Sequence, residues 1–206
     1  MKVLVACEYS GIVRDAFARL GHDAWSCDIL PTESKGNHIQ DDVLNHLDKG
    51  WDLMIAHPPC TYLSNAGIRW FNEDKYGEKA RLRKQLRLEA LEFVKKLYYC
   101  NIPKVCIENP VGYLNYNFKK PDQIVQPYYF GDEESKRTCF WYKNLKPLKH
   151  TKLVEPKIYG YYKTGKKIGK PIYFHEYNSG KDRAKIRSKF WKGIADAMAA
   201  QWSLND

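Results

Sequence analysis

The sequence predicts an α/β protein with a doubly wound parallel sheet. Along the first half of the chain, short apolar runs of strand length alternate with segments whose apolar residues repeat at helical spacing. Polar residues follow several of these runs directly, as expected where parallel strands end at a ligand-binding edge. The 206 residues, 44% of them hydrophobic, are enough for one packed domain.

The order of the expected elements supports this fold class. They are a strand at residues 3–6, a helix at 11–20 that Gly21 ends, a strand at 24–29, a short helical or loop segment closing at Leu47, a strand at 52–56, an amphipathic helix at 81–99, a strand at 105–107 and a last helix at 187–202. Between residue 115 and the last helix, repeated prolines interrupt the pattern, and we expect irregular structure there.

Positive charge is concentrated in the carboxyl-terminal part of the chain. Residues 1–70 hold six Lys or Arg and nine acidic residues, whereas residues 143–192 hold fifteen Lys or Arg and three acidic residues. Aromatic residues lie among the basic ones, a mixture suited to phosphate contacts and base stacking. This pattern favours a nucleic-acid partner for residues 143–185, although a solvated basic surface over an aromatic core would produce it too.

The six cysteines form neither a metal-binding nor a disulfide pattern. None lies in a Cys-x-x-Cys pair, and Cys7, Cys27 and Cys106 lie in or beside apolar strand-like runs, so no metal site is expected. The chain shows no signal-peptide h-region, and no apolar stretch approaches the roughly 20 residues that span a bilayer. We therefore expect a soluble, cytoplasmic protein without membrane contact.

A proline-rich loop, His57-Pro58-Pro59-Cys60, follows the apolar strand expected at 52–56. Its two prolines restrict the backbone and hold the next side chain in one place. A cysteine at the carboxyl end of a parallel strand is suited to nucleophilic attack, because nearby amides or cations lower the thiol pKa. The alternative is a buried structural cysteine, since free cysteines are among the most buried residues.

A carboxylate follows another strand of the expected sheet. Glu108 and Asn109 come directly after the apolar run at 105–107. Because burial of an unpaired carboxylate is costly, a functional role for Glu108 is expected. If the two strands are neighbours, Cys60 and Glu108 face one pocket.

The ordered motifs Pro58-Pro59-Cys60 and Glu108-Asn109-Pro110 resemble the Pro-Pro-Cys and Glu-Asn-Val motifs of the DNA cytosine carbon-5 methyltransferases. The final helix resembles that of a compact, largely phage-associated branch of this family. The resemblance implies a Rossmann-like class I methyltransferase fold, S-adenosylmethionine as cofactor and DNA as partner. The target base would be flipped out of a duplex or already single-stranded.

The resemblance also implies a cofactor site along the first two strands. Asp28 takes the place of the acid that holds the ribose hydroxyls, and Asp42 that of the residue contacting the adenine amino group. The loop at residues 8–11 is similar to the glycine-rich cofactor loop of the family. The expected cofactor-binding residues are Glu8, Tyr9, Ser10, Gly11, Asp28, Ile29, Asp42, Val43, His57 and Pro58.

Five residues receive catalytic roles from this resemblance. Cys60 would add to carbon 6 of cytosine, and Glu108, with a raised pKa, would protonate ring nitrogen 3. Asn109 would orient Glu108 or hold the exocyclic amino group. Lys136 or Arg137, in a segment similar to a Gln-x-Arg-x-Arg motif, would bind the carbonyl oxygen.

The same resemblance divides the chain into three parts. Residues 1–142 form the catalytic core, and residues 143–185 are a basic, aromatic-rich segment where larger members carry a target-recognition domain. Residues 186–206 are expected to pack back on the core as a terminal helix.

Other functions remain open. An amino-methyltransferase uses an Asp/Asn-Pro-Pro-aromatic loop, in which Cys60 is a poor replacement for the stacking residue. The same covalent chemistry could act on a free cytidine nucleotide or use a modified donor. A non-enzymatic nucleic-acid-binding protein on a degenerate methyltransferase fold would need neither Cys60 nor Glu108.

Overall fold

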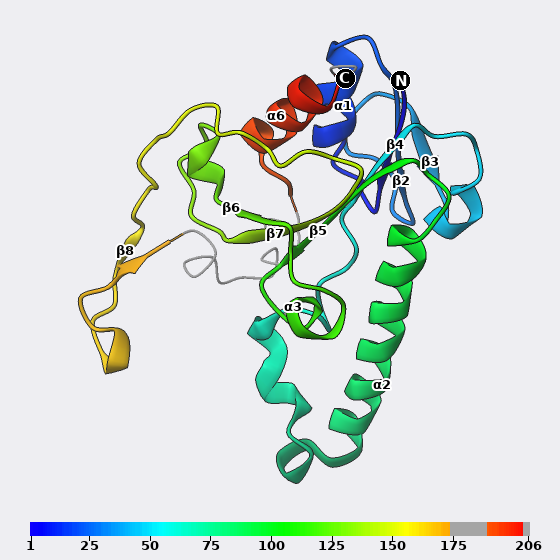
Figure 1. Ribbon diagram of the computed structural model, residues 1–206. Coiled ribbons are helices and arrows are strands. Elements are labelled where there is room, and N and C mark those ends of the chain that lie inside the picture. The colour runs from blue at the N-terminus through cyan, green and yellow to red at the C-terminus, as the bar shows by residue number, and fades with distance from the viewer. Residues whose placement is uncertain (174–188, 204–206) are drawn as a thin grey trace.

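A seven-stranded sheet forms the centre of the computed structural model, which describes residues 1–173 and 189–203 (Figure 1). The strand order is β3-β2-β1-β4-β5-β7-β6. Neighbouring strands from β3 to β5 are parallel, whereas β7 runs antiparallel to both β5 and β6. The strands span Lys2–Ala6 (β1), Asp23–Asp28 (β2), His38–Gln40 (β3), Leu53–Ala56 (β4), Lys104–Pro110 (β5), Gln123–Val125 (β6) and Thr138–Lys143 (β7). The expected α/β class is confirmed as a mostly parallel sheet flanked by helices.

Helices cover both faces of this sheet. Helix α1 (Ile12–Arg19) packs against α6 (Lys192–Trp202) over one face, and the long helix α2 (Glu73–Tyr98) lies over the other. In β1, alternate residues enter the two cores: Val3 and Val5 join the first, while Leu4 and Ala6 join the second. A strand buried on both faces explains the uninterrupted apolar run in its sequence.

Shorter elements connect the layers. They are the helix α3 (Leu114–Asn117) and the 3-10 segments η1 (Val43–His46), η2 (Asn65–Phe71), η3 (Pro127–Tyr129) and η4 (Gly165–Lys167). Strands β8 (Gly160–Tyr161) and β9 (Pro171–Ile172) form a separate antiparallel pair within the expected basic segment. Residues 174–185 of that segment, and 186–188 and 204–206 of the expected terminal part, lie outside the described residues.

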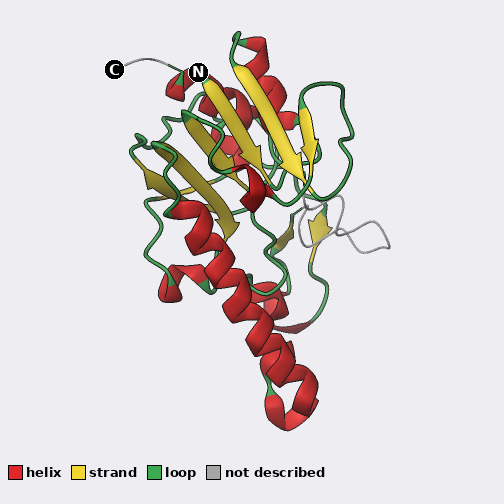
Figure 2. Cartoon of the chain, turned by 90° about the vertical axis from the view of Figure 1, so that its right-hand side faces the viewer, coloured by secondary structure: helices red, strands yellow, loops and turns green. Residues whose placement is uncertain are grey.

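Helix α2 projects beyond the sheet, with its amino-terminal end furthest from it (Figure 2). It begins at Glu73, eight residues before the expected start, and is broken at Gly77, which has φ 49° and ψ −125°. We call η2 and the first part of α2, residues 65–88, the arm. The break and the high charge of the first turns conceal the true start of this helix in the sequence.

Several expected boundaries were wrong. Strand β5 continues to Pro110, because β7 pairs with it as far as Thr138, so Glu108 lies inside a strand rather than after one. The last helix starts at Lys192 and not at 187. Strands β3, β6 and β7 were not expected. Because β3 comes before it, the strand expected at 52–56 is the fourth strand of the chain and not the third. In residues 1–173 and 189–203, no helix combines the length and apolar character needed to cross a bilayer.

Candidate active site

The carboxyl ends of β4 and β5 bring the proline loop that carries Cys60 and the strand that carries Glu108 to the same edge of the sheet. Ala56 pairs with Ile107 in the sheet, so His57 and Glu108 are adjacent where the two strands reach this edge. The backbone then turns at Cys60, whose carbonyl oxygen accepts hydrogen bonds from Leu63 N at 3.1 Å and Ser64 N at 2.9 Å. The Cys60 side chain itself is exposed. The turn therefore presents the thiol to solvent at the edge of the sheet.

The other cysteines provide a contrast with Cys60. Cys106 and Cys139 are buried in the sheet, and burial raises the pKa of both thiols. Burial also raises the pKa of Cys7, and raises that of Cys27 to about 11. Thiols in such surroundings are poor nucleophiles at neutral pH. The alternative of a buried structural cysteine thus fits Cys27, Cys106 and Cys139, and not Cys60.

His57 and Glu108 form the central polar contact of the site. His57 Nδ1 lies 3.2 Å from Glu108 Oε2, and the two side chains are 11% and 12% exposed. The ring of Phe190 lies against the imidazole, with 4.6 Å between the centroids. Among the described residues, the buried Nε2 of His57 has no hydrogen-bond partner. His57 therefore has one nitrogen in contact with Glu108, whereas its other nitrogen is buried without a hydrogen-bond partner among the same residues.

The expected raised pKa of Glu108 was wrong. Burial raises the pKa of this carboxyl, but the hydrogen bond from His57, the charge of Lys136 and the charge of His57 together outweigh that effect. The pKa of Glu108 consequently lies below its ordinary value. In this state of the protein Glu108 is a carboxylate held by His57 and Lys136.

Asn109 holds the loop that carries Cys60. Its Nδ2 donates a 2.8 Å hydrogen bond to the carbonyl oxygen of Pro58, and the residue is only 1% exposed. Its Oδ1 is buried without a hydrogen-bond partner in the described part of the chain. The structure thus gives Asn109 a contact with the proline loop rather than with Glu108.

Two arginines of α2 hold the residues that follow Cys60. Arg83 Nη2 donates to the Thr61 carbonyl at 2.8 Å, and Arg87 Nε donates to the Tyr62 carbonyl at 2.9 Å. The Arg87 guanidinium also lies 3.2 Å from the centre of the Phe71 ring. These arginines were not expected as site residues, because only the fold shows that helix α2 passes beside the turn. Their single sequence signal is the basic character of the helix.

The segment expected to bind the carbonyl oxygen lies just before β7. Lys136 is partly buried, and its charge acts on Glu108, which places it within the same site. Arg137 is exposed, and its charge acts on Cys139 rather than on Glu108. Of the two, Lys136 is therefore the better candidate for a substrate contact.

The loop after β1 is fixed by its own contacts. Glu8 is 4% exposed, and its carboxylate oxygens accept hydrogen bonds from Val13 N at 2.7 Å and Arg14 N at 3.1 Å. These are unpaired amides at the start of α1, so Glu8 stabilises the helix terminus. Burial raises the pKa of Glu8, which His57 and the two amides oppose. Tyr9 and Ser10 follow, and the Ser10 hydroxyl donates to Glu8 Oε1 at 3.3 Å.

Gly11 is required at the start of α1. Its φ is 76°, a conformation that side chains rarely adopt, and a Cβ there would overlap the Ser34 hydroxyl and the Arg14 guanidinium. Arg14 is 1% exposed and donates to Ser34 Oγ at 2.5 Å and to the Lys35 carbonyl at 3.0 Å. This buried arginine ties the loop at 32–36 to the loop at 8–11.

Asp28 and Asp42 lie on adjoining loops at the same sheet edge. Asp28 ends β2, and its carbonyl oxygen accepts a hydrogen bond from Asp41 N at 3.1 Å. Asp28 Oδ1 accepts from Leu30 N at 2.9 Å, and Asp42 Oδ1 accepts from Leu44 N at 3.0 Å. Both carboxylates thus have fixed orientations at the ends of neighbouring strands.

The hydrogen-bond acceptors at this edge could hold the adenosine part of S-adenosylmethionine. Carboxylates accept hydrogen bonds from ribose hydroxyls and an adenine amino group, and Asp28 and Asp42 supply one on each loop. Ile29, beside Asp28, is 73% exposed, and an adenine ring could cover such an apolar side chain. Val43, beside Asp42, is buried and anchors its loop. Among the described residues, no cluster of three potential metal ligands occurs.

Comparisons with known proteins add no assignment: no protein-family model matches the chain, and a search of curated proteins found no match.

Proposed function

We propose that the protein transfers a methyl group from S-adenosylmethionine to carbon 5 of cytosine in DNA, through a transient bond between Cys60 Sγ and carbon 6 of the base. One observation carries this proposal: the proline loop that carries the exposed Cys60 also carries His57, whose side chain contacts Glu108 at the carboxyl edge of parallel strands. Ligands of open α/β sheets bind at this edge.

The sheet topology supports a Rossmann-like class I methyltransferase fold. The order β3-β2-β1-β4-β5 is that of a doubly wound sheet, whose direction of winding reverses between β1 and β4. The loops after β1 and β4 carry Gly11 and Cys60, so the expected cofactor and substrate residues flank this reversal. The antiparallel β7 lies between β5 and β6 and departs from an all-parallel sheet.

Cys60 would begin the reaction, because carbon 5 of cytosine is too weakly nucleophilic to attack a methyl donor. The thiolate forms a bond to carbon 6 and so adds electron density to carbon 5. When bound, S-adenosylmethionine supplies the methyl group as an electrophile. A base then removes the carbon-5 proton, the electron pair of that bond restores the ring double bond, and the Cys60 thiolate leaves.

Glu108 would control the charge on the ring. As Cys60 adds, ring nitrogen 3 becomes more basic and must receive a proton or a strong hydrogen bond. The carboxyl group is ionised while His57 and Lys136 hold it. A bound cytosine would cover Glu108, and its carbonyl oxygen would engage Lys136. Part of the stabilisation of the carboxylate would then be lost, and the pKa of Glu108 would rise towards the value that a proton donor needs.

The experiment that tests this function is mass spectrometry of nucleosides after incubation with S-adenosylmethionine. Duplex DNA, single-stranded DNA and cytidine nucleotides are supplied in separate reactions. The proposal expects a gain of one methyl group on DNA cytosine, absent with Cys60→Ser. A gain on the free nucleotide alone would support the nucleotide alternative, and no gain with retained DNA binding would support a binding protein.

A further inference from the structure

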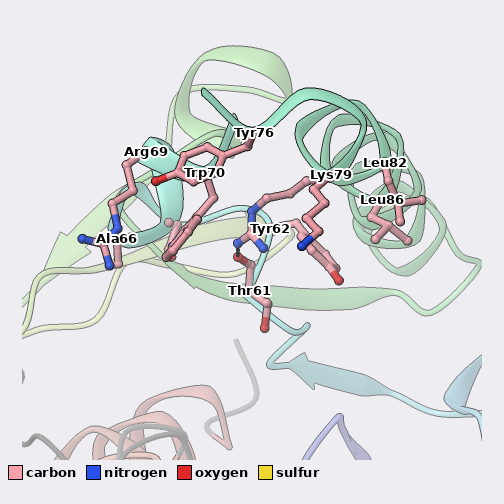
Figure 3. A pocket seen from close by; sticks show the side chains of 12 residues that line it. Thr61, Tyr62, Ala66, Arg69, Trp70, Tyr76, Lys79, Leu82 and Leu86 are labelled. Carbon is pink, nitrogen blue, oxygen red and sulfur yellow. Dashed lines mark hydrogen bonds between the residues drawn. The ribbon is translucent and has the colours of Figure 1, made fainter. Parts of the chain in front are cut away.

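A pocket lies beside Cys60, between the arm and the turn that follows the cysteine. Its volume is about 740 Å³, within the range of ligand-binding pockets. Figure 3 shows Arg69 and Trp70 on the η2 side, and Leu82 and Leu86 on the α2 side. The lining residues are Thr61, Tyr62, Ser64, Ala66, Gly67, Arg69, Trp70, Tyr76, Lys79, Leu82, Arg83 and Leu86.

Aromatic rings are presented to solvent in this pocket. Trp70 is 41% exposed, although tryptophan is usually well buried. Its ring centroid lies 4.9 Å from that of Tyr76, and the Arg69 guanidinium lies 4.7 Å from the Trp70 centroid. Tyr62 forms a similar pair with Arg83, at 4.9 Å. These rings and guanidinium groups offer flat surfaces on which a base can stack.

The arm is also basic. Residues 65–88 contain seven Lys or Arg and three acidic residues, and one of the acids, Glu73, pairs with Lys84. Lys79 lines the pocket and, in the part of the chain that the structure describes, has no ion-pair partner. Arg83 Nε is buried and lacks a hydrogen-bond partner among the same residues. The pocket therefore combines stacking surfaces with uncompensated positive charge, which complements a phosphate backbone.

The pocket is joined directly to the proposed nucleophile. Thr61 and Tyr62 follow Cys60, and their carbonyl oxygens accept the hydrogen bonds from Arg83 and Arg87 described above. A strand whose target base reaches Cys60 would thus place its neighbouring nucleotides against the arm.

We propose that this pocket binds the nucleotides next to the target cytosine in a single-stranded stretch of DNA. Their bases stack on Trp70 and Tyr76, and their phosphates contact Arg69 and Lys79. Stacking of this kind requires unpaired bases, because duplex bases are already stacked. The binding site itself follows from the pocket, and its alignment with a target cytosine rests on the proposed function.

Fluorescence anisotropy with a labelled 12-nucleotide oligodeoxycytidine tests the proposal. We expect Trp70→Ala to weaken binding about tenfold, a common loss for one stacked base. Tyr116→Ala, which removes an 87% exposed ring on α3, should leave binding unchanged. A plot of log affinity against log salt concentration has a negative slope. We expect Lys79→Gln to make this slope less steep by about 0.7, the value for one phosphate contact on a single strand. Lys96→Gln, at the far end of α2, is its matched control.

The binding assay separates this inference from the proposed function. Loss of binding in Trp70→Ala and Lys79→Gln, with an unchanged thermal melting curve, supports the pocket even if no methyl transfer is found. Equal binding by Trp70→Ala, Tyr116→Ala and the unaltered protein overturns the pocket, even if DNA is methylated. A clear preference for the duplex over the single strand also overturns it.

Discussion

His57 Nδ1 and Glu108 Oε2 lie 3.2 Å apart, and this contact connects the loop after β4 with β5 although the two residues are 51 positions apart in the chain. The contact lowers the pKa of a carboxyl that burial alone would raise. It also aligns the proline loop with β5. The electrostatics of the candidate site and the position of Cys60 are therefore linked through one pair of side chains.

The first prediction concerns the pH dependence of stability. The folded-state pKa of Glu108 lies below its unfolded value of about 4.3, so the unfolded chain binds the proton more tightly. Glu108 thus contributes stability that is present above about pH 4.3 and is lost as the pH falls through the folded pKa. We expect Glu108→Gln to lower the free energy of unfolding by about 1 kcal/mol at pH 7, and by less at pH 3.5.

Urea unfolding at the two pH values measures this difference. Glu78→Gln removes an exposed acid on α2 and serves as the matched control, with no expected change. An equal loss for Glu108→Gln at both pH values would contradict the assigned pKa direction.

Asn109→Ala removes the hydrogen bond to the Pro58 carbonyl. Because that carbonyl is left without its donor, we expect a loss of about 1–3 kcal/mol in the free energy of unfolding. We also expect kcat to fall more than KM rises, since the loop that positions Cys60 is released. Asn117→Ala, which removes an exposed side-chain bond to the Tyr113 carbonyl, is the control. Unaltered unfolding and turnover in Asn109→Ala would show that the loop does not depend on this bond.

Gly11→Ala and Gly21→Ala separate backbone strain from side-chain overlap. The two glycines have similar φ angles, 76° and 82°, so both variants carry the left-handed penalty of about 1–2 kcal/mol. Only the methyl group at Gly11 would overlap Ser34 and Arg14, whereas the space around Gly21 is open. Thermal unfolding should show a clearly larger loss for Gly11→Ala. Equal melting temperatures would mean that the loop at 32–36 moves aside without cost.

Asp28→Asn tests the proposed adenosine site. We expect the Kd for S-adenosylmethionine to rise about tenfold, because a neutral amide accepts hydrogen bonds from ribose hydroxyls less strongly than a carboxylate. Isothermal titration calorimetry measures the change, and Asp48→Asn, an exposed acid outside this edge, is the control. The same Kd in both variants would argue against a ribose contact at Asp28.

Much of the amino-terminal sheet was predictable, because β1 and β4 are apolar runs of strand length and β2 contains the apolar residues Ala24, Trp25 and Cys27. Strand β3 was missed because its three residues, His38–Gln40, include only one apolar side chain. Strands β6 and β7 lie among prolines that obscure the pattern, although four of the six residues of β7 are apolar or aromatic. The position of β7 beside β5, and of β6 beside β7, depends on antiparallel pairing, which sequence periodicity does not reveal.

The reactive residues were easier to predict than their surroundings. Cys60 and Glu108 follow or end apolar runs, a signal that sequence reasoning can use. The pairing of Glu108 with His57 and Lys136 depends on the order of the strands, and the sign of the Glu108 pKa shift depends on that pairing. The hydrogen bond from Asn109 to the Pro58 carbonyl also depends on the order of the strands, because Pro58 lies in the loop after β4 and Asn109 lies in β5.

The most direct test of the central claim is a search for the covalent intermediate on Cys60. A single-stranded oligonucleotide with 5-fluorocytosine at the target position is incubated with the protein and S-adenosylmethionine, and the product is analysed by denaturing mass spectrometry. Fluorine replaces the proton that a base must remove, so the thiol cannot be expelled after methyl transfer. We predict a complex with the mass of protein, oligonucleotide and one methyl group, absent in Cys60→Ser. An equal amount of complex with Cys60→Ser, or methylation of ordinary cytosine by that variant, would contradict the account.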